Sequence, residues 1–200
     1  TGSPIYLPGS TLTYESGTLT AGDEWLAGAT VVGAGVPENV TIGSFITLPS
    51  GAAHAVPGDF VIDGVGGGDF TMNSALSVSG NWTSTNFHPN GNIVTFAGNA
   101  DQTVLSADAV APVAFDLLAL NKTGGSVLLG SDASCTSGGG GVALAFNGTQ
   151  DVLNLGAHSF TQRGAIGGSD ATGAFAGSSA ATLSLTGSGD GGTLRFAAGD

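Results

Sequence analysis

The sequence predicts an all-β protein whose short strands form a β-solenoid, and a β-sandwich is the alternative that the same pattern allows. The expected strands are short and numerous, with turn residues between them. Glycine accounts for 36 of the 200 residues and recurs where a coil must bend sharply or adopt a positive φ angle. Apolar residues stand at alternate positions, as in Leu76 and Val78, so each strand supplies only one or two core side chains. These three observations favour the solenoid.

The strands are expected in runs rich in Val, Ile, Leu, Phe and Thr, separated by Gly, Asn, Asp and Ser. Helix-forming signals are confined to residues 98–120, and Pro112 interrupts that stretch. From the N-terminus, the expected strands are Thr11–Tyr14, Thr18–Thr20, Thr30–Val32, Asn39–Ile42, Phe45–Leu48, Ala53–Val56, Phe60–Ile62, Phe70–Met72, Ala75–Val78, Ile93–Phe96, Gln102–Val104, Phe115–Leu120, Val127–Leu129, Val142–Phe146, Val152–Leu155, Phe160–Gln162, Thr182–Thr186 and Thr193–Phe196.

Two pairs of segments look like an internal repeat. Phe96 and Phe196 lie in similar contexts, and residues 74–80 resemble residues 180–187. We therefore expect residues 1–200 to form a single β-solenoid region, a fragment of a longer repetitive protein, in which residues 193–200 begin another set of coils. The expected core is a stack of apolar side chains from successive coils, such as Phe96, Phe115, Leu120, Phe146 and Leu155.

The charge of the chain is strongly acidic. Fifteen Asp and Glu residues face only three basic ones, Lys122, Arg163 and Arg195, for a net charge of −12. This balance argues against nucleic acid and against anionic membrane surfaces, because both require basic residues. No apolar run is long enough to span a bilayer. The acidity fits solubility in a secreted or high-salt setting, and cation binding by some of the Asp residues is the alternative.

Three consecutive stretches carry a recognisable pattern: GNWTSTNFHPNGNIVTFAGNADQTV, then AFDLLALNKTGGSVLLGSD, then VALAFNGTQDVLNLGAHSFTQRG. In these stretches the chain resembles the β-helical repeat modules of large adhesin-like proteins, secreted or on the cell surface, of Bacteroidetes-type bacteria. The residues that match the module pattern are Gly80, Asn81, Trp82, Thr83, Phe87, Val94, Phe96, Gly98, Gln102, Thr103, Phe115, Leu117, Leu120, Asn121, Lys122, Leu153, Leu155 and Gly156.

The resemblance covers roughly residues 10 to 165, and it departs from the module pattern at Asp116 and in the loose linker SCTSGGGG. It implies a right-handed parallel β-helix that forms stalks and adhesin-like surfaces. The motif identifies a type of module and does not identify a ligand.

The aromatic side chains are the candidates for ligand binding. Trp25, Trp82 and Tyr14, together with Tyr6 and Phe87, would form a sugar-stacking strip if they were exposed. The alternative is that these rings pack in the core, where aromatic residues of a solenoid stack between coils. The sequence favours core packing and leaves both interpretations open.

No catalytic residue or metal ligand is assigned from the sequence. Asp23 and Glu24 are adjacent acids without a visible partner acid, so we expect Asp23 to cap a turn beside a packed Trp25. The three histidines, His54, His88 and His158, lie too far apart for a zinc or copper motif.

Three further features favour a structural role. Cys135 is the only cysteine and sits in a small-residue loop, so we expect an unreactive thiol. The stretches GVGGGDFTM and GSGDGGTL resemble calcium-binding β-roll repeats but lack their register and tandem copies. Lys122 is expected in a solvated turn.

These observations predict a structural or adhesive module without enzyme activity, serving as a stalk, spacer or filament segment of an extracellular or cell-surface protein. The alternatives are a carbohydrate-binding module and a polysaccharide-active enzyme on a β-helix. The expected partners are other copies or neighbouring modules of the same protein and surface glycans. Nucleic acid, membrane insertion and cofactors are not expected, with Ca²⁺ as the one candidate ion.

Overall fold

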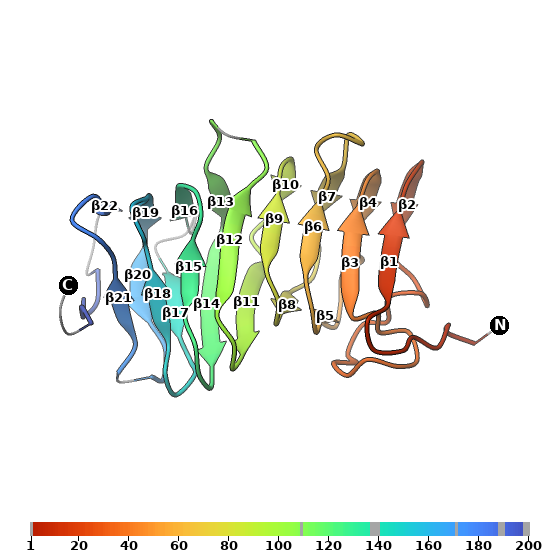
Figure 1. Cartoon of the computed structure of the whole chain (residues 1–200), viewed down its shortest axis with the longest axis horizontal. Helices are drawn as coiled ribbons and strands as arrows, with labels where there is room; N and C mark the ends of the chain where they lie inside the picture. Colours follow the sequence, from red (N-terminus) through yellow and green to blue (C-terminus); the bar gives the residue numbers. More distant parts are fainter. Residues whose placement is uncertain (1, 109, 137–140, 171, 188–190, 198–200) are drawn as a thin grey trace.

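The protein is an all-β solenoid of parallel strands. A computed structural model describes residues 2–108, 110–136, 141–170, 172–187 and 191–197, and within these ranges every regular element is a β-strand. The strands stack coil upon coil along one axis (Figure 1) and pair in parallel with the strands of the preceding and following coils. The predicted solenoid is therefore confirmed, and the sandwich alternative is excluded.

The strands form three faces along the solenoid. The first face is one eight-stranded sheet. Its strands are β1 (Thr11–Tyr14), β3 (Asn39–Ile42), β6 (Phe60–Ile62), β9 (Trp82–Ser84), β12 (Gln102–Ser106), β15 (Val127–Leu129), β18 (Val152–Asn154) and β21 (Ala174–Ala176). The third face is one six-stranded sheet. Its strands are β5 (His54–Val56), β8 (Leu76–Val78), β11 (Ile93–Gly98), β14 (Leu117–Lys122), β17 (Val142–Phe146) and β20 (Ala165–Gly167).

The second face differs from the other two because it is divided into two four-stranded sheets. The N-terminal sheet contains β2 (Thr18–Thr20), β4 (Phe45–Thr47), β7 (Asp69–Thr71) and β10 (Phe87–His88). The C-terminal sheet contains β13 (Val113–Phe115), β16 (Ala133–Thr136), β19 (Ser159–Arg163) and β22 (Thr182–Thr186). The division falls between β10 and β13, in the middle of the molecule.

The coils wind right-handed. In Figure 1 the chain rises along the first face in front, crosses the top along the second face and descends along the third face behind, while it advances toward the C-terminus. This is the hand that parallel strands with crossover connections almost always adopt. Leu12 pairs with Val40, and Val40 pairs with Phe60, so neighbouring coils differ in length from 28 to 20 residues.

The core is a mostly apolar interior shared by all three faces. Alternate side chains of each strand point inward, and those of successive coils stack into columns, such as Val40, Phe60, Trp82 and Val104 on the first face. The five core residues named from the sequence are all buried: Phe96, Phe115, Leu120, Phe146 and Leu155. Each such burial contributes about 1.5–3 kcal/mol, so the columns supply most of the folding free energy.

The aromatic residues concentrate in the N-terminal half of this core. Trp25, Phe60, Phe70 and Trp82 form a chain of ring contacts with centroids 4.7 to 6.2 Å apart. The chain continues through Phe87 to Phe115, whose centroids are 5.9 Å apart. Such pairs contribute beyond their buried area, so the N-terminal coils have the denser aromatic core.

Glycine permits the sharp corners. Gly98 ends β11 with a φ angle of 92°, a left-handed conformation that costs a residue with a Cβ about 1–2 kcal/mol. At Gly125, with a φ angle of 65°, a Cβ would also lie 2.5 Å from the backbone of Ala100 in the preceding coil. These positions require glycine for the reason expected from the sequence.

Several strand predictions need correction. The expected strand Thr30–Val32 is wrong, because these residues belong to an excursion, residues 21–38, that pairs only through the isolated bridges Ile5–Ala34 and Gly33–Val36. Residues 193–196 form one parallel bridge, Phe175–Phe196, rather than a strand. The helical turn considered for residues 98–120 is also wrong, since the described part of that stretch contains β12, β13 and β14. Strands β9, β10, β16, β20 and β21 were not anticipated.

The similar segments in the sequence do not mark equivalent positions. Phe96 lies in β11 on the third face, whereas Phe196 bridges to Phe175 on the first face. Likewise, residues 74–80 contain β8 on the third face, and residues 180–187 contain β22 on the second face. The structural repeat is the single coil, and its period is shorter than the spacing of these segments.

Candidate functional site

The break in the second face forms a concave site on the side of the solenoid. Between β10 and β13 lies a cavity of about 240 Å³. Its polar lining comes from Ser84, Asn86, His88, Ser106 and Asp108. It exists because β10 is the last strand of one sheet and β13 the first of the next, so no strand pairing closes the gap.

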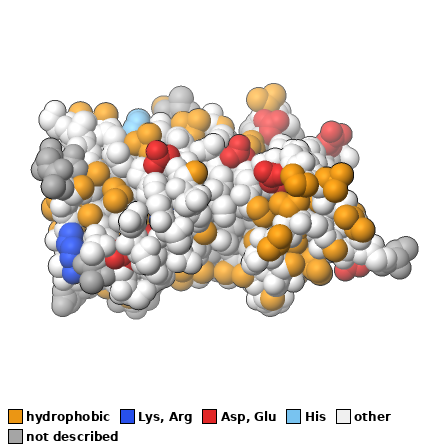
Figure 2. All heavy atoms as spheres, turned by 60° about the horizontal axis from the view of Figure 1, so that its bottom comes forward, with side chains coloured by type: hydrophobic (Ala, Val, Ile, Leu, Met, Phe, Trp, Pro, Cys, Tyr) orange, Lys and Arg blue, Asp and Glu red, His pale blue; other side chains and the backbone are white. Residues whose placement is uncertain are grey.

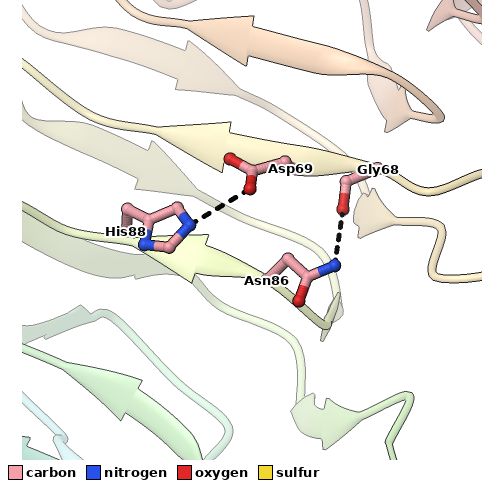
Figure 3. Close-up of polar contacts among 4 residues, drawn as sticks. All are labelled: Gly68, Asp69, Asn86 and His88. Atoms are coloured by element: carbon pink, nitrogen blue, oxygen red, sulfur yellow. Dashed lines mark hydrogen bonds and ion pairs between the residues drawn. The ribbon is translucent and has the colours of Figure 1, made fainter.

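A hydrogen-bonding contact between side chains links the edge strand β10 to β7. Figure 3 shows the His88 ring extending toward the carboxylate of Asp69, with Nε2 and Oδ2 3.2 Å apart. Next to it, the Asn86 side-chain amide donates to the Gly68 carbonyl oxygen over 3.3 Å. Asn86 itself has a positive φ angle of 24°. The two contacts fix the exposed side chains at the rim of the break.

The hydroxyl groups of Ser84 and Ser106 at the break are already engaged, whereas Thr85 Oγ1, also in its lining, is buried without a hydrogen-bond partner. The Trp82 indole N–H donates to Ser84 Oγ over 2.7 Å, and Ser106 Oγ donates to the Asp108 carbonyl oxygen over 2.7 Å. The remaining donors and acceptors, on His88 and Asn86, suit the orientation of a small polar ligand by hydrogen bonds. In the described ranges, no group of three or more His, Cys, Asp or Glu residues is arranged to hold a metal ion.

The aromatic binding candidates lie in the core. Trp25 and Trp82 are 0% exposed and Tyr14 is 6% exposed. The Trp25 indole N–H donates to the Ala55 carbonyl oxygen over 3.0 Å, which ties the N-terminal excursion to the third face. Because stacking on a sugar needs an accessible ring face, these three side chains have a packing role in the folded protein.

Glu24 is the acid with the clearest role in the N-terminal coil. Its Oε1 accepts hydrogen bonds from the Tyr14 hydroxyl at 2.8 Å and from the Gly22 N–H at 2.9 Å. Burial alone would raise the pKa of Glu24, but these bonds and its own N–H outweigh burial and lower the pKa. The turn at Gly22 is therefore held by Glu24, where the sequence suggested a capping role for Asp23.

Lys122 is an internal cation, and the expectation of a solvated turn residue is wrong. Its side chain is 0% exposed at the end of β14. Nζ donates to Gln102 Oε1 over 2.5 Å and to the Ala100 carbonyl oxygen over 2.6 Å, with the Ala97 carbonyl oxygen 3.4 Å away. Burial lowers the pKa of Lys122, and the nearby carboxylates of Asp101 and Asp151 oppose that shift. From inside the core, the Lys122 ammonium group thus hydrogen-bonds to the corner of the preceding coil, residues 97–102.

Asn and Asp side chains connect coils at the corner between the third and first faces. There the side-chain Oδ1 of one residue accepts a hydrogen bond from the backbone N–H of a residue in the next coil. The pairs are Asn39 with Asp59 at 2.8 Å, Asp59 with Asn81 at 2.7 Å, Asn81 with Thr103 at 2.9 Å and Asp101 with Ser126 at 2.7 Å. The Ser126 N–H and hydroxyl lower the pKa of Asp101. Part of the acidic excess therefore stabilises the fold.

The other residues singled out from the sequence have structural surroundings. Cys135 lies in β16 rather than in a loop, and burial raises the pKa of its thiol to about 12. His54 is buried in β5, with Nδ1 3.2 Å from Ser74 Oγ. His158 lies 3.7 Å from Asp132. Of the two calcium-like stretches, the first places Asp69 against His88, and Asp190 of the second lies outside the described residues.

The C-terminal end of the solenoid carries a second, larger hollow. A cavity of about 570 Å³ opens there, lined mainly by Leu155, Phe175, Ala176, Leu183 and Phe196. Phe175 is buried, whereas Phe196, the next side chain of the same column, is 59% exposed. The hollow is the uncovered end of the core.

Comparison of the chain with models of protein families, with curated proteins and with solved structures gives no match. Among the described residues, none forms a helix of the length and apolarity that a membrane crossing requires. The functional argument therefore rests on the geometry of the solenoid itself.

Proposed function

We propose that the chain is a structural or adhesive module without enzyme activity: a rigid spacer or filament segment of an extracellular or cell-surface protein. The observation that carries the proposal is the uninterrupted eight-stranded first face, with one apolar core beneath it. With neighbouring strands about 4.8 Å apart, seven spacings give a rod of about 34 Å along the coil axis.

The interior contacts support a mechanical role. Lys122 and Gln102 in the core, and the exposed corner carboxylates of Asp59 and Asp101, join successive coils by hydrogen bonds. Among the described buried side-chain atoms, only Ser44 Oγ, Thr85 Oγ1 and Gln162 Oε1 lack a hydrogen-bond partner. Such satisfied polar networks rigidify a fold, which is what a spacer requires.

A carbohydrate-binding module is the second candidate, and one observation favours it. The break between β10 and β13 is concave and lined by polar groups, including His88 and Asn86. Phe87 lines the break and is half-buried, whereas Trp25, Trp82 and Tyr14 are buried, so the break has no broad exposed aromatic platform on which a sugar could stack. We therefore rank it below the spacer.

Single-molecule pulling, with the chain held between two folded reference domains, tests the spacer. A coil of about 22 residues has a contour length of about 75 Å. We expect unfolding events that release multiples of this length at forces above those of the reference domains. Unfolding in one step at a lower force would contradict a load-bearing spacer.

A glycan array and a reducing-sugar assay on polysaccharides test the alternatives in parallel. The proposal predicts neither binding nor hydrolysis. Specific glycan binding that is lost in both His88→Ala and Asn86→Ala would replace the spacer with the carbohydrate-binding module. The matched control is His158→Ala, which removes a half-exposed histidine outside the break.

A further inference from the structure

We propose that a hollow on the side of the solenoid binds a small organic cation, one that joins a charged amine to an apolar body. The hollow lies at the corner between the first and second faces, beside the loop that connects β12 to β13. Its volume is about 410 Å³, whereas the break between β10 and β13 has about 240 Å³. Ligand pockets usually have about 300–1,000 Å³, so the hollow is large enough for such a ligand.

One part of the lining is apolar and comes from β12 and the loop that follows it. Leu105 points outward from the first face and is 40% exposed, and Val110 in the loop is 92% exposed. In Figure 1 this loop projects at the top of the molecule, between β12 and β13. Pro112 adds to the same wall. Covering apolar surface of this kind with a ligand is favourable.

A glycine keeps the space beside this wall open. Gly130 lines the hollow in the coil that follows β12. A Cβ at Gly130 would lie 3.3 Å from Leu105 Cδ1 and 3.1 Å from Thr103 Cγ2. A larger side chain there would therefore occupy the space next to Leu105 that the ligand needs.

Another part of the lining carries a carboxylate and an imidazole. Asp132 and His158 both line the hollow, with Asp132 Oδ1 3.7 Å from His158 Nδ1, and their side chains are 59% and 36% exposed. A carboxylate accepts strong, charge-assisted hydrogen bonds from an ammonium group, and a neutral imidazole offers one further acceptor nitrogen. These two side chains present hydrogen-bond acceptors to a ligand.

The Asp132 carboxylate is held in place by the coils on both sides. The Asp132 carbonyl oxygen accepts the Val113 N–H of the preceding coil over 2.9 Å, and Asp132 Oδ1 accepts the Ser159 N–H of the next coil over 2.8 Å. Next to Asp132, Ser131 Oγ accepts the Ser106 N–H over 2.7 Å. A site whose groups are ordered before the ligand arrives loses less entropy on binding.

The charge of the hollow selects a cation. Its lining includes the Asp132 carboxylate, and among the described residues that line it there is no Lys or Arg. The chain as a whole carries a net charge of −12, and the basic side chains visible in Figure 2 lie at the C-terminal end of the rod. Such a charge distribution attracts cations and repels anions.

The apolar and the charged parts of the lining together define the class of ligand. A metal ion would leave Leu105 and Val110 uncovered, and the described residues contain no group of three His, Cys, Asp or Glu side chains that could hold one. A neutral apolar molecule would leave the Asp132 carboxylate without a donor. An alkylammonium or arylammonium ion covers the apolar wall and pairs with the carboxylate.

Titration of the whole chain with phenethylammonium chloride, followed by the NMR signals of methyl groups and histidine rings, tests the proposal. We expect saturable shifts of the Leu105, Val110 and His158 signals, with a dissociation constant of about 5 mM or lower. The neutral analogue 2-phenylethanol should bind about threefold more weakly, because it lacks the charge that pairs with Asp132. Methylammonium should bind about tenfold more weakly, because it has no apolar body.

Two pairs of variants separate the two parts of the lining. Asp132→Asn keeps the oxygen that accepts the Ser159 N–H but removes the charge, so it should weaken binding about threefold. Asp23→Asn, at an exposed acid of the N-terminal excursion, is its matched control and should not. Val110→Ser should also weaken binding, whereas Val65→Ser, at a 99% exposed valine in another loop, should leave it unchanged.

Three results would overturn the proposal. The first is that the Leu105 and Val110 signals do not shift at ligand concentrations up to about 20 mM. The second is equal affinity for phenethylammonium and 2-phenylethanol, which would show that the hollow does not select for charge. The third is an equal loss of affinity in Asp132→Asn and Asp23→Asn, which would show general attraction by an acidic chain. The pulling experiment tests the spacer role separately from all three.

Discussion

The N-terminal and C-terminal ends of the solenoid finish the same core in different ways. At the N-terminal end the excursion of residues 21–38 folds over the third face and places Trp25 in the core at 0% exposure, with its ring stacked near Phe70. At the C-terminal end Phe196 is 59% exposed beside an open hollow. We therefore expect the coils to be less stable at the end where the core columns are uncovered, and Trp25 to close the other end.

Removing the Trp25 side chain should lower the free energy of unfolding more than any other change considered. Trp25→Ala deletes ring contacts with Phe60 and Phe70 and the hydrogen bond to Ala55, so we expect a loss of about 3–5 kcal/mol in the free energy of unfolding. The matched change at the other end, Phe196→Ala, should cost less than about 1 kcal/mol because that ring is exposed. Urea denaturation of both variants measures the difference, and equal losses would refute the contrast between the ends.

Lys122 lies between the two ends, and its loss should have the next largest effect. Lys122→Met leaves Gln102 Oε1 and the Ala100 carbonyl oxygen without their donor, which should cost about 2–3 kcal/mol. Arg163→Met removes an exposed cation and should change stability by less than about 0.5 kcal/mol. Thermal unfolding of both variants tests this. Equal stability of Lys122→Met and the natural chain would show that the internal ammonium is dispensable.

Acid should destabilise the N-terminal coils through His54. Burial lowers the pKa of His54 below its usual 6.5, so the unfolded chain binds a proton that the folded chain does not. Stability is therefore complete above pH 6.5 and falls as the pH drops below it, by at most about 1.4 kcal/mol per pH unit, until the lowered pKa is reached. His54→Asn should reduce the slope. An unchanged slope in His54→Asn would show that another titratable group causes the acid sensitivity.

The architecture could be predicted because apolar residues recur at every second position of the sequence, which is also the spacing of inward-pointing side chains along a strand. Val94 and Phe96 alternate with small or polar residues, and both side chains point into the core. The strands that were missed, such as β16, β20 and β21, are rich in Ala, Gly and Ser. They are extended because they pair with parallel strands of the neighbouring coils. The strand propensity of their own residues does not indicate this pairing.

Tertiary context also explains the strand that was predicted where none forms. Thr30–Val32 has the composition of a strand, but its coil is enlarged by the excursion and offers no neighbouring strand. Lys122 was misplaced because a lysine in a Gly-rich context is usually solvated. The only sequence signal for its burial was its position two residues after Leu120 in an alternating strand, which sets its side chain inward. The break between β10 and β13 depends on coil-to-coil pairing and had no local signal.

Hydrogen exchange followed by mass spectrometry, at a protein concentration of a few micromolar, tests the contrast between the ends most directly. We expect the amides of β3, β6 and β9 on the first face to exchange most slowly. Those of β21 and β22, beside the open hollow, should exchange fastest among the strands. Protection that is uniform along the rod, or lower in β3 and β6 than in β21 and β22, would contradict the closed N-terminal and open C-terminal ends.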